Sequence, residues 1–248
     1  MIRLIIGVIF IALFLILGLP VMLVIKIIGS FKPETADYAA LRTVQWALRV
    51  LTFISGAQVT VIGEERIPDG PVLYVGNHRS YFDVFLTYPR CKGLTGFVAK
   101  KETLNYPILR QWMKMVKCVF LDRENPREGL KAILQAIAQV KGGISMVIFP
   151  EGTRNTGEEL TLLPFKAGSL KIAEKSGCPI VPVSMNNTRA VFEAQAPIVK
   201  KAQVVIEYGE PIYPNGMDRA QKRQLEKNVQ TIIQDTIVKN AALIQKES

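Results

Sequence analysis

The segment PVLYVGNHRSYFD, residues 71–83, changes from apolar to polar within a few positions. Its first part, Pro71–Val75, is rich in β-branched and aromatic residues, which predicts a buried strand. The polar part begins at Gly76 and contains His78, so this histidine is expected at the carboxyl end of the strand. Open α/β sheets bind their ligands at that end of their strands. The segment therefore predicts a strand of an α/β sheet and a candidate site beside it.

His78 is the only histidine in the chain of 248 residues. An imidazole has an unperturbed pKa of about 6.5, so near pH 7 much of it is neutral and can accept a proton. Asp83 can reach the ring only if His78 precedes a helix and Asp83 lies in its first turn, because on a regular helix this offset separates two side chains by about 140°. Asp83 would then fix the ring tautomer, and His78 would take a proton from a substrate hydroxyl. The alternative is that residues 80–83 form a helix capping box and that His78 is an ordinary polar residue.

Short runs rich in β-branched residues recur along the chain and predict further strands. They lie at Gln58–Ile62, Gly96–Lys100, Cys118–Leu121, Ile144–Phe149, Ile180–Ser184 and Gln203–Tyr208. A turn through residues 68–70 is expected to join the first two strands. Apolar residues at helical spacing predict helices at Pro126–Val140, with Leu130, Ile133, Leu134 and Ile137, at Ala167–Lys175, and after Asp218, with Leu225, Val229, Ile232, Ile233, Ile237 and Ala241 on one face. This alternation predicts a single α/β domain with a mixed, mostly parallel sheet flanked by helices.

The stretch Leu4–Ile25, near the N-terminus, contains no charged residue. As a helix it would be about 33 Å long, enough to cross the hydrocarbon core of a bilayer. Gly18 and Pro20 also allow a kinked or re-entrant membrane helix. A secretory signal is the competing interpretation, but the stretch is longer than a typical one and no small-x-small cleavage site follows it.

More basic residues follow this stretch than precede it, namely Lys26, Lys32, Arg42 and Arg49. The positive-inside rule therefore places the main domain on the cytoplasmic face of the membrane, which in a bacterium is the inner membrane. An amphipathic helix is expected at about Ala36–Ile54, either packed on the core or lying in the membrane interface. These features divide the chain into a membrane-anchoring helical region, residues 1–55, and an α/β domain, residues 56–248.

The composition narrows the functional classes. A formal net charge of +10 indicates an anionic partner. The basic residues are scattered and no nucleic-acid-binding module is recognisable, so we expect no nucleic acid. The three cysteines, Cys91, Cys118 and Cys178, have neither a disulfide framework nor metal-ligand spacing, which favours a reducing compartment and no metal site.

A second polar segment, FPEGTRN at residues 149–155, also ends an apolar run. Gly152 allows close backbone approach, and the guanidinium of Arg154 suits a carboxylate or a phosphate. The alternative is a surface turn in which Glu151 pairs with Arg154. Lys166 precedes a predicted helix, where a lysine and backbone N–H groups form an anion site, although a lysine at such a position is commonly only solvated.

The order His-x4-Asp and then Pro-Glu-Gly-Thr-Arg resembles the glycerolipid acyltransferase family, and within it the 1-acyl-sn-glycerol-3-phosphate acyltransferases. The resemblance covers residues 63–211 and includes the N-terminal membrane helix. Two weaker blocks also match, one from Ala99–Glu102 to Val119–Arg123 and one at Ile180–Val183. Arg79 and Asn155 depart from the family pattern, where glutamine and serine are usual, and this leaves the acceptor in doubt.

The resemblance implies roles for individual residues. His78 would be the general base and Asp83 the residue that orients it. Phosphate and glycerol contacts would come from a larger set, namely Glu151, Gly152, Thr153 and Arg154, with Lys100 or Lys101. Arg123 would contact the substrate or support the site. Backbone N–H groups near Gly152 or Asn77 would stabilise the oxyanion.

The expected reaction transfers an acyl chain from coenzyme A or acyl carrier protein to the sn-2 hydroxyl of 1-acylglycerol-3-phosphate, which gives phosphatidic acid for phospholipid biosynthesis. Direct attack needs no covalent intermediate, no metal and no cofactor besides the thioester. The expected partners are the bilayer, a lysophospholipid acceptor and the acyl donor. The alternatives are the same transfer to glycerol phosphate, a lyso-aminolipid or another lysophospholipid, and a lipid-binding protein without turnover.

Overall fold

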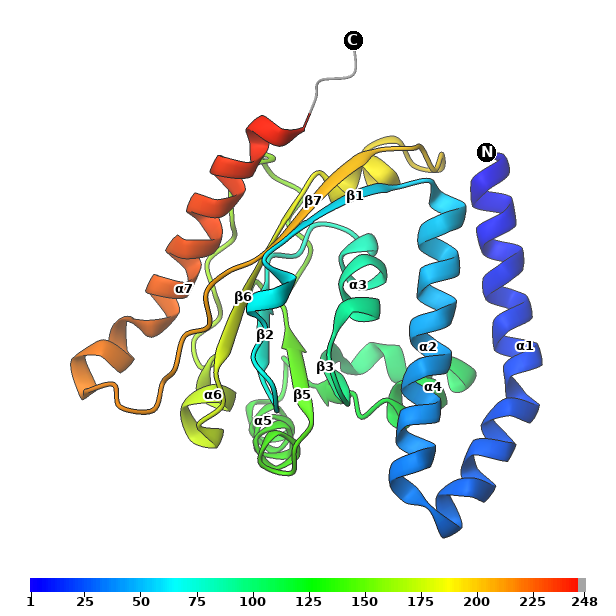
Figure 1. Ribbon diagram of the computed structural model, residues 1–248, viewed down its shortest axis with the longest axis horizontal. Coiled ribbons are helices and arrows are strands. Elements are labelled where there is room, and N and C mark those ends of the chain that lie inside the picture. The colour runs from blue at the N-terminus through cyan, green and yellow to red at the C-terminus, as the bar shows by residue number, and fades with distance from the viewer. Residues whose placement is uncertain (245–248) are drawn as a thin grey trace.

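The computed structural model describes residues 1–244, so residues 245–248 of the predicted second domain lie outside the described part. A twisted sheet lies in the middle of the molecule with helices on both faces, and a pair of long helices lies at one side (Figure 1). The strands are β1 (Gln58–Ile62), β2 (Leu73–Gly76), β3 (Thr95–Lys100), β4 (Val119–Leu121), β5 (Ser145–Ile148), β6 (Ile180–Asn186) and β7 (Gln203–Tyr208).

The sheet has the order β1-β7-β6-β2-β5-β3-β4. All neighbouring strands are parallel except β6 and β7, which are antiparallel. The predicted mixed, mostly parallel sheet is therefore confirmed. The first two strands are not neighbours, because β7 and β6 lie between β1 and β2. The turn at residues 68–70 thus belongs to a connection that passes the ends of β7 and β6 along one edge of the sheet.

The side chains of Val72–Val75, in and directly before β2, point alternately to the two faces of the sheet, as the period of a strand requires. Val72 and Tyr74 belong to a cluster with α2 (Pro33–Ser55), α3 (Phe82–Thr87) and α4 (Pro107–Met115). Leu73 and Val75 belong to a cluster with three other helices, α5 (Pro126–Lys141), α6 (Lys171–Ser176) and α7 (Arg219–Asn240). The buried strand that precedes His78 therefore has helices on both sides.

Two predicted helix faces differ in the structure. On α5, Leu130 and Leu134 are 59% and 55% exposed, and the buried positions are Ala132, Ala136 and Val140, which allow the helix to approach the sheet closely. On α7, the capping box of Asp218 is present and four of the predicted apolar residues are buried, but Ile232 is exposed. The helix predicted from Ala167 begins only at Lys171, because residues before it form a turn.

The N-terminal pair consists of α1 (Ile2–Phe31) and α2, which run antiparallel to each other (Figure 1). By length and composition, α1 could cross a membrane, and it continues through Pro20 without a break. Gly18 lies against the ring of Trp112, since a Cβ there would be 3.0 Å from it. One face of α2 packs on the core, so the packing interpretation of that helix is confirmed. The boundary at residue 55 coincides with the end of α2, and the division into two domains stays a prediction.

Candidate active site

The register of the sheet brings the two polar segments together. β2 pairs with β5 so that Leu73 lies opposite Met146 and Val75 opposite Ile148. Continuing this register past the ends of both strands places His78 opposite Glu151. Both strands leave the sheet at the same edge because they are parallel. The two motifs are far apart in sequence and are neighbours at the carboxyl edge.

His78 and Asp83 meet in the arrangement that their spacing allows. His78 lies in the turn before α3, and Asp83 is the second residue of that helix. The ring Nδ1 is 2.7 Å from Asp83 Oδ2. A carboxylate can only accept, so the proton lies on Nδ1 and Nε2 is left as the basic nitrogen. The ring is 20% exposed and stacks on Phe149 with centroids 4.3 Å apart.

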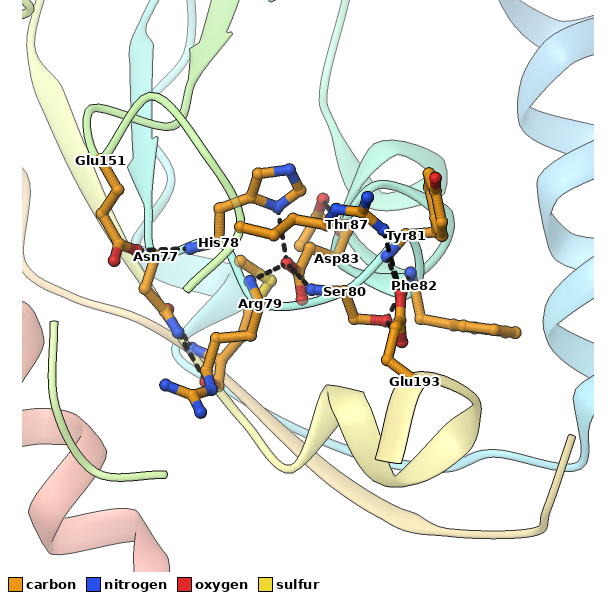
Figure 2. Close-up of polar contacts among 12 residues, drawn as sticks. Asn77, His78, Arg79, Ser80, Tyr81, Phe82, Asp83, Thr87, Glu151 and Glu193 are labelled. Atoms are coloured by element: carbon orange, nitrogen blue, oxygen red, sulfur yellow. Dashed lines mark hydrogen bonds and ion pairs between the residues drawn. The ribbon is translucent and has the colours of Figure 1, made fainter. Parts of the chain in front are cut away.

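The same carboxylate oxygen also holds the backbone of the turn. Asp83 Oδ2 accepts hydrogen bonds from the N–H groups of Arg79, at 2.6 Å, and Ser80, at 2.7 Å (Figure 2). Ser80 Oγ accepts from the N–H of Phe82. Only half of the capping box is therefore present, because Asp83 accepts from the N–H of Ser80 but Ser80 Oγ accepts from Phe82 and not from Asp83. The fully buried carboxylate of Asp83 makes this contact and the contact with the histidine ring together.

Glu151 lies beside the backbone of His78 and is 1% exposed. Its carboxylate accepts from the N–H of His78 at 2.7 Å and from the N–H of Leu163 at 2.8 Å. Burial raises the pKa of the Glu151 carboxyl, and these two N–H donors act in the opposite direction. The alternative of a surface Glu151–Arg154 pair is wrong, because Arg154 contacts other residues.

The guanidinium of Arg154 lies 3.9 Å from the centroid of the Tyr81 ring and 3.6 Å from Glu193. Glu193 in turn accepts from Ser80 Oγ at 2.6 Å and from the N–H of Tyr81 at 2.8 Å. Glu193 therefore connects the start of α3 with Arg154, the residue predicted to bind the phosphate. Sequence analysis missed Glu193, since no motif surrounds it and only the return of the chain after β6 brings it here.

The remaining predicted basic residues differ in the contacts that their side chains make. Lys101 is paired with Asp122 at 2.6 Å, whereas the exposed side chain of Lys100 has no partner within residues 1–244. Arg123 and Lys166 both approach Gly152. A Cβ there would lie 3.4 Å from Lys166 Cγ and 3.7 Å from Arg123 Cζ, and the φ of Gly152 is +76°. The positive φ of Gly152 therefore favours glycine, whereas a Cβ there would make only ordinary van der Waals contacts with the two basic side chains.

The backbone donor at Gly152 is already in use. Its N–H donates to the carbonyl of Phe149 at 3.0 Å, so the Gly152 N–H itself is not free for an oxyanion. Thr153, the next residue, is exposed. In the described part of the chain, no cluster of three His, Cys, Asp or Glu residues could hold a metal ion.

The two residues that depart from the family pattern hold one loop. Arg79 is buried and donates to the carbonyls of Gly157 at 2.7 Å and Glu158 at 2.9 Å. The amide nitrogen of the Asn155 side chain donates to the carbonyl of Thr161 at 2.7 Å. The backbone N–H of Asn155 donates to the carbonyl of His78 at 2.7 Å. These residues act on the loop that supports His78.

A family model described as "Acyltransferase" matches residues 58–186, which is more than half of the chain. The protein belongs to the acyltransferase family. The matched region begins at β1 and ends with β6, so it contains both polar segments of the site. As a member of this family, the chain has its two motifs at adjacent ends of parallel strands.

Proteins named 1-acyl-sn-glycerol-3-phosphate acyltransferase are similar in sequence to this acyltransferase-family chain. One from Saccharomyces cerevisiae is 30% identical over 76% of this chain and 62% of its own length. One from Cocos nucifera is 36% identical over 66% of this chain and 53% of its own length. The chain thus spans less than two thirds of both. One from Borreliella burgdorferi is 31% identical, over 80% of this chain and 77% of its own length.

The fold is also similar to a solved structure. The crystal structure of the 1-acyl-sn-glycerophosphate (LPA) acyltransferase PlsC from Thermotoga maritima has a TM-score of 0.83 to this chain and a sequence identity of 24%. The similarity covers 99% of this chain and 97% of that one. It includes the pair of N-terminal helices as well as the sheet, which establishes the fold of the whole chain.

Proposed function

We propose that this protein transfers an acyl chain from a thioester donor to the sn-2 hydroxyl of 1-acylglycerol-3-phosphate and so makes phosphatidic acid. The observation that carries the proposal is the contact between His78 Nδ1 and Asp83 Oδ2 at 2.7 Å, at the sheet edge where Arg154 also lies. The sequence similarity to proteins named for this activity supports it.

In the proposed reaction, Nε2 of His78 takes the proton of the acceptor hydroxyl as its oxygen attacks the thioester carbonyl. The carbon–sulfur bond then breaks, and the protonated ring gives its proton to the leaving thiolate. Asp83 holds the ring in the required tautomer and stabilises its charged form. No bond to the protein forms in this mechanism, and each proton transfer in it uses the imidazole of His78.

The basic residues are proposed to bind the phosphate of the acceptor. Arg123 and Lys166 both lie within 4 Å of the Cβ position at Gly152, and within residues 1–244 neither has a carboxylate at ion-pair distance. The positive charges of Arg123 and Lys166 repel each other, so an anion bound between these two side chains would be stabilised. Arg154 adds a planar donor on the side of β2, and Lys100 adds an unpaired ammonium at the end of β3.

We propose that α1 anchors the protein in the membrane and that the α/β part lies on its cytoplasmic face. An apolar groove of about 240 Å³ runs between α1, α2 and α3 and is lined in part by Gly7, Tyr81 and Phe82. It therefore reaches the start of the helix that holds Asp83. Such a groove suits an acyl chain that enters from the bilayer.

A two-by-two assay tests the proposal. The purified protein is given a coenzyme A or a carrier-protein thioester, each with lysophosphatidate or glycerol phosphate. Phosphatidic acid formed from lysophosphatidate with at least one donor is the expected result, and the donor series identifies the carrier. Binding of lysophosphatidate without product from either donor would instead favour the lipid-binding alternative. Product only from glycerol phosphate would assign another acceptor.

Arg154→Ala is expected to raise KM for lysophosphatidate on the order of 10- to 100-fold, since a hydrogen bond between charged groups contributes about 1.5–3 kcal/mol. The value of kcat should change much less, because the base is untouched. Steady-state kinetics with the acceptor varied measures both. Arg127→Ala, at an exposed arginine at the start of α5, is the matched control and should behave as wild type. An unchanged KM in Arg154→Ala would contradict the assignment.

Gly7→Phe is expected to lower turnover with long acyl chains more than with short ones. No atom lies within 4 Å of a Cβ at Gly7, so the new ring would extend into the groove. The measurement compares donors and acceptors of increasing chain length. Val24→Phe places the same ring at an exposed position of α1 and should leave the preference unaltered. An equal loss for all lengths would show that the groove does not hold the chain.

A further inference from the structure

We propose that Glu151 is a positioning residue that fixes the backbone of His78, and that it does not bind the acceptor. The proposal rests on the function proposed above, in which His78 is the base, and it changes the role that the family resemblance implies for this carboxylate. Four observations on the molecule carry it.

The first observation is that both carboxylate oxygens of Glu151 are in use. Oε1 accepts from the N–H of His78 and Oε2 from the N–H of Leu163. The side chain is 1% exposed, so no surface remains on which a glycerol hydroxyl or a phosphate could bind. A negative charge would also repel the phosphate of the acceptor.

The second observation concerns the neighbouring strands. Asn77 replaces the lost strand pairing on the side of β6, since its amide donates to the carbonyl of Met185 at 2.9 Å and accepts from the N–H of Met185 at 2.8 Å. Glu151 does the same on the side of β5, where the register of β2 and β5 brings it opposite His78. After β2 has ended, Asn77 is therefore held on the side of β6 and His78 on the side of β5.

The third observation is that the His78 peptide is held at both of its polar groups. Glu151 accepts its N–H, and the backbone N–H of Asn155 donates to its carbonyl at 2.7 Å. Both partners come from the segment that follows β5. Figure 2 shows Glu151 on one side of His78 and Asp83 on the other.

The fourth observation is that, within residues 1–244, two contacts fix the ring itself, the stacking on Phe149 and the hydrogen bond with Asp83. Neither of these ring contacts holds the N–H of His78, which only the carboxylate of Glu151 accepts among the described residues. A backbone shift would move Nε2 away from the acceptor hydroxyl, and a displacement of about 1 Å can cost on the order of 10²-fold in rate. The carboxylate of Glu151 therefore fixes the position of the base together with the backbone N–H of Asn155.

Glu151→Gln tests the proposal because it keeps the shape and offers an amide NH2 to one of the two N–H donors. We expect kcat with lysophosphatidate to fall on the order of 10²-fold while KM stays within about twofold. Glu158→Gln removes a charge from an exposed residue of the same loop and should leave both constants unchanged. A rise in KM that accounts for the loss of kcat/KM would overturn the proposal, and so would an unchanged kcat.

The single histidine provides a second test that needs no turnover. Labelling with ¹⁵N-histidine gives one backbone amide and one ring, both from His78. In the wild-type protein, the His78 amide should be protected from hydrogen exchange, with and without lysophosphatidate, because Glu151 covers it. Rapid exchange, or loss of protection when lysophosphatidate binds, would overturn the proposal even if Glu151→Gln fails to fold. This measurement also stands if the acceptor proves to be a different molecule.

Discussion

Membranes that contain the His78→Ala protein are expected to lose acyl transfer to lysophosphatidate by about 10³-fold or more. His78 is the only histidine in the chain, so no other imidazole can replace it. The protein should still fold, because Asp83 keeps the hydrogen bonds from the N–H groups of Arg79 and Ser80. The loss should therefore appear in kcat and not in the amount of folded enzyme.

The measurement is the rate of phosphatidic acid formation per folded enzyme, with thermal unfolding of the variant recorded alongside. Lysophosphatidate should still bind, since the basic residues are unchanged. Turnover near that of the wild type would reject the assignment of His78 as the base and, with it, the proposed mechanism.

Asp83→Asn is expected to lower kcat by about 10²- to 10⁴-fold with little change in KM for the acceptor. The three groups that donate to Oδ2 are the ring of His78 and the N–H groups of Arg79 and Ser80. A neutral amide no longer selects the ring tautomer or stabilises the charged ring. Its NH2 group would also occupy the position of Oδ1, which is buried and has no partner in the described structure.

The variant should also be less stable, since an unpaired buried polar group costs about 1–3 kcal/mol. Thermal unfolding and steady-state kinetics measure the two effects separately. Asp235→Asn, at an exposed position on α7, is the matched control and should change neither. If Asp83→Asn lowered the unfolding temperature but left kcat unchanged, Asp83 would support the turn without orienting the base.

Much of the architecture could be predicted from local patterns. The strands at Gln58–Ile62 and Gln203–Tyr208 have the predicted bounds, and the capping box at Asp218 begins the final helix. The buried face of α5 was predicted in part, since Ile133 and Ile137 pack against the core whereas Leu130 and Leu134 are exposed. Apolar residues at helical spacing do not show that the smaller alanines beside them make the closest approach to the sheet, which only the packing reveals.

The contact between His78 and Asp83 was also within reach of the sequence, since a short offset permits one geometry only. The choice between Lys100 and Lys101 was not, because adjacent lysines have the same local pattern. The two lysines differ in the structure, because Asp122 at the end of the neighbouring strand β4 pairs with Lys101. Our proposal that Lys100 binds the phosphate rests on this difference. Glu193 was missed because its partners Ser80, Tyr81 and Arg154 lie in segments that are distant from it in the sequence.

The sequence alone determined which segments form strands and helices along the chain, the family, and the pair that could transfer a proton. Each of these depends on short motifs whose residues are near one another in the sequence. The tertiary structure decided that Glu151 is buried against the backbone of His78 while Arg154, three residues later, reaches Tyr81 and Glu193. Which of two nearby charged residues faces solvent depends on strand register and on the return of distant loops. Neither is encoded in the local pattern.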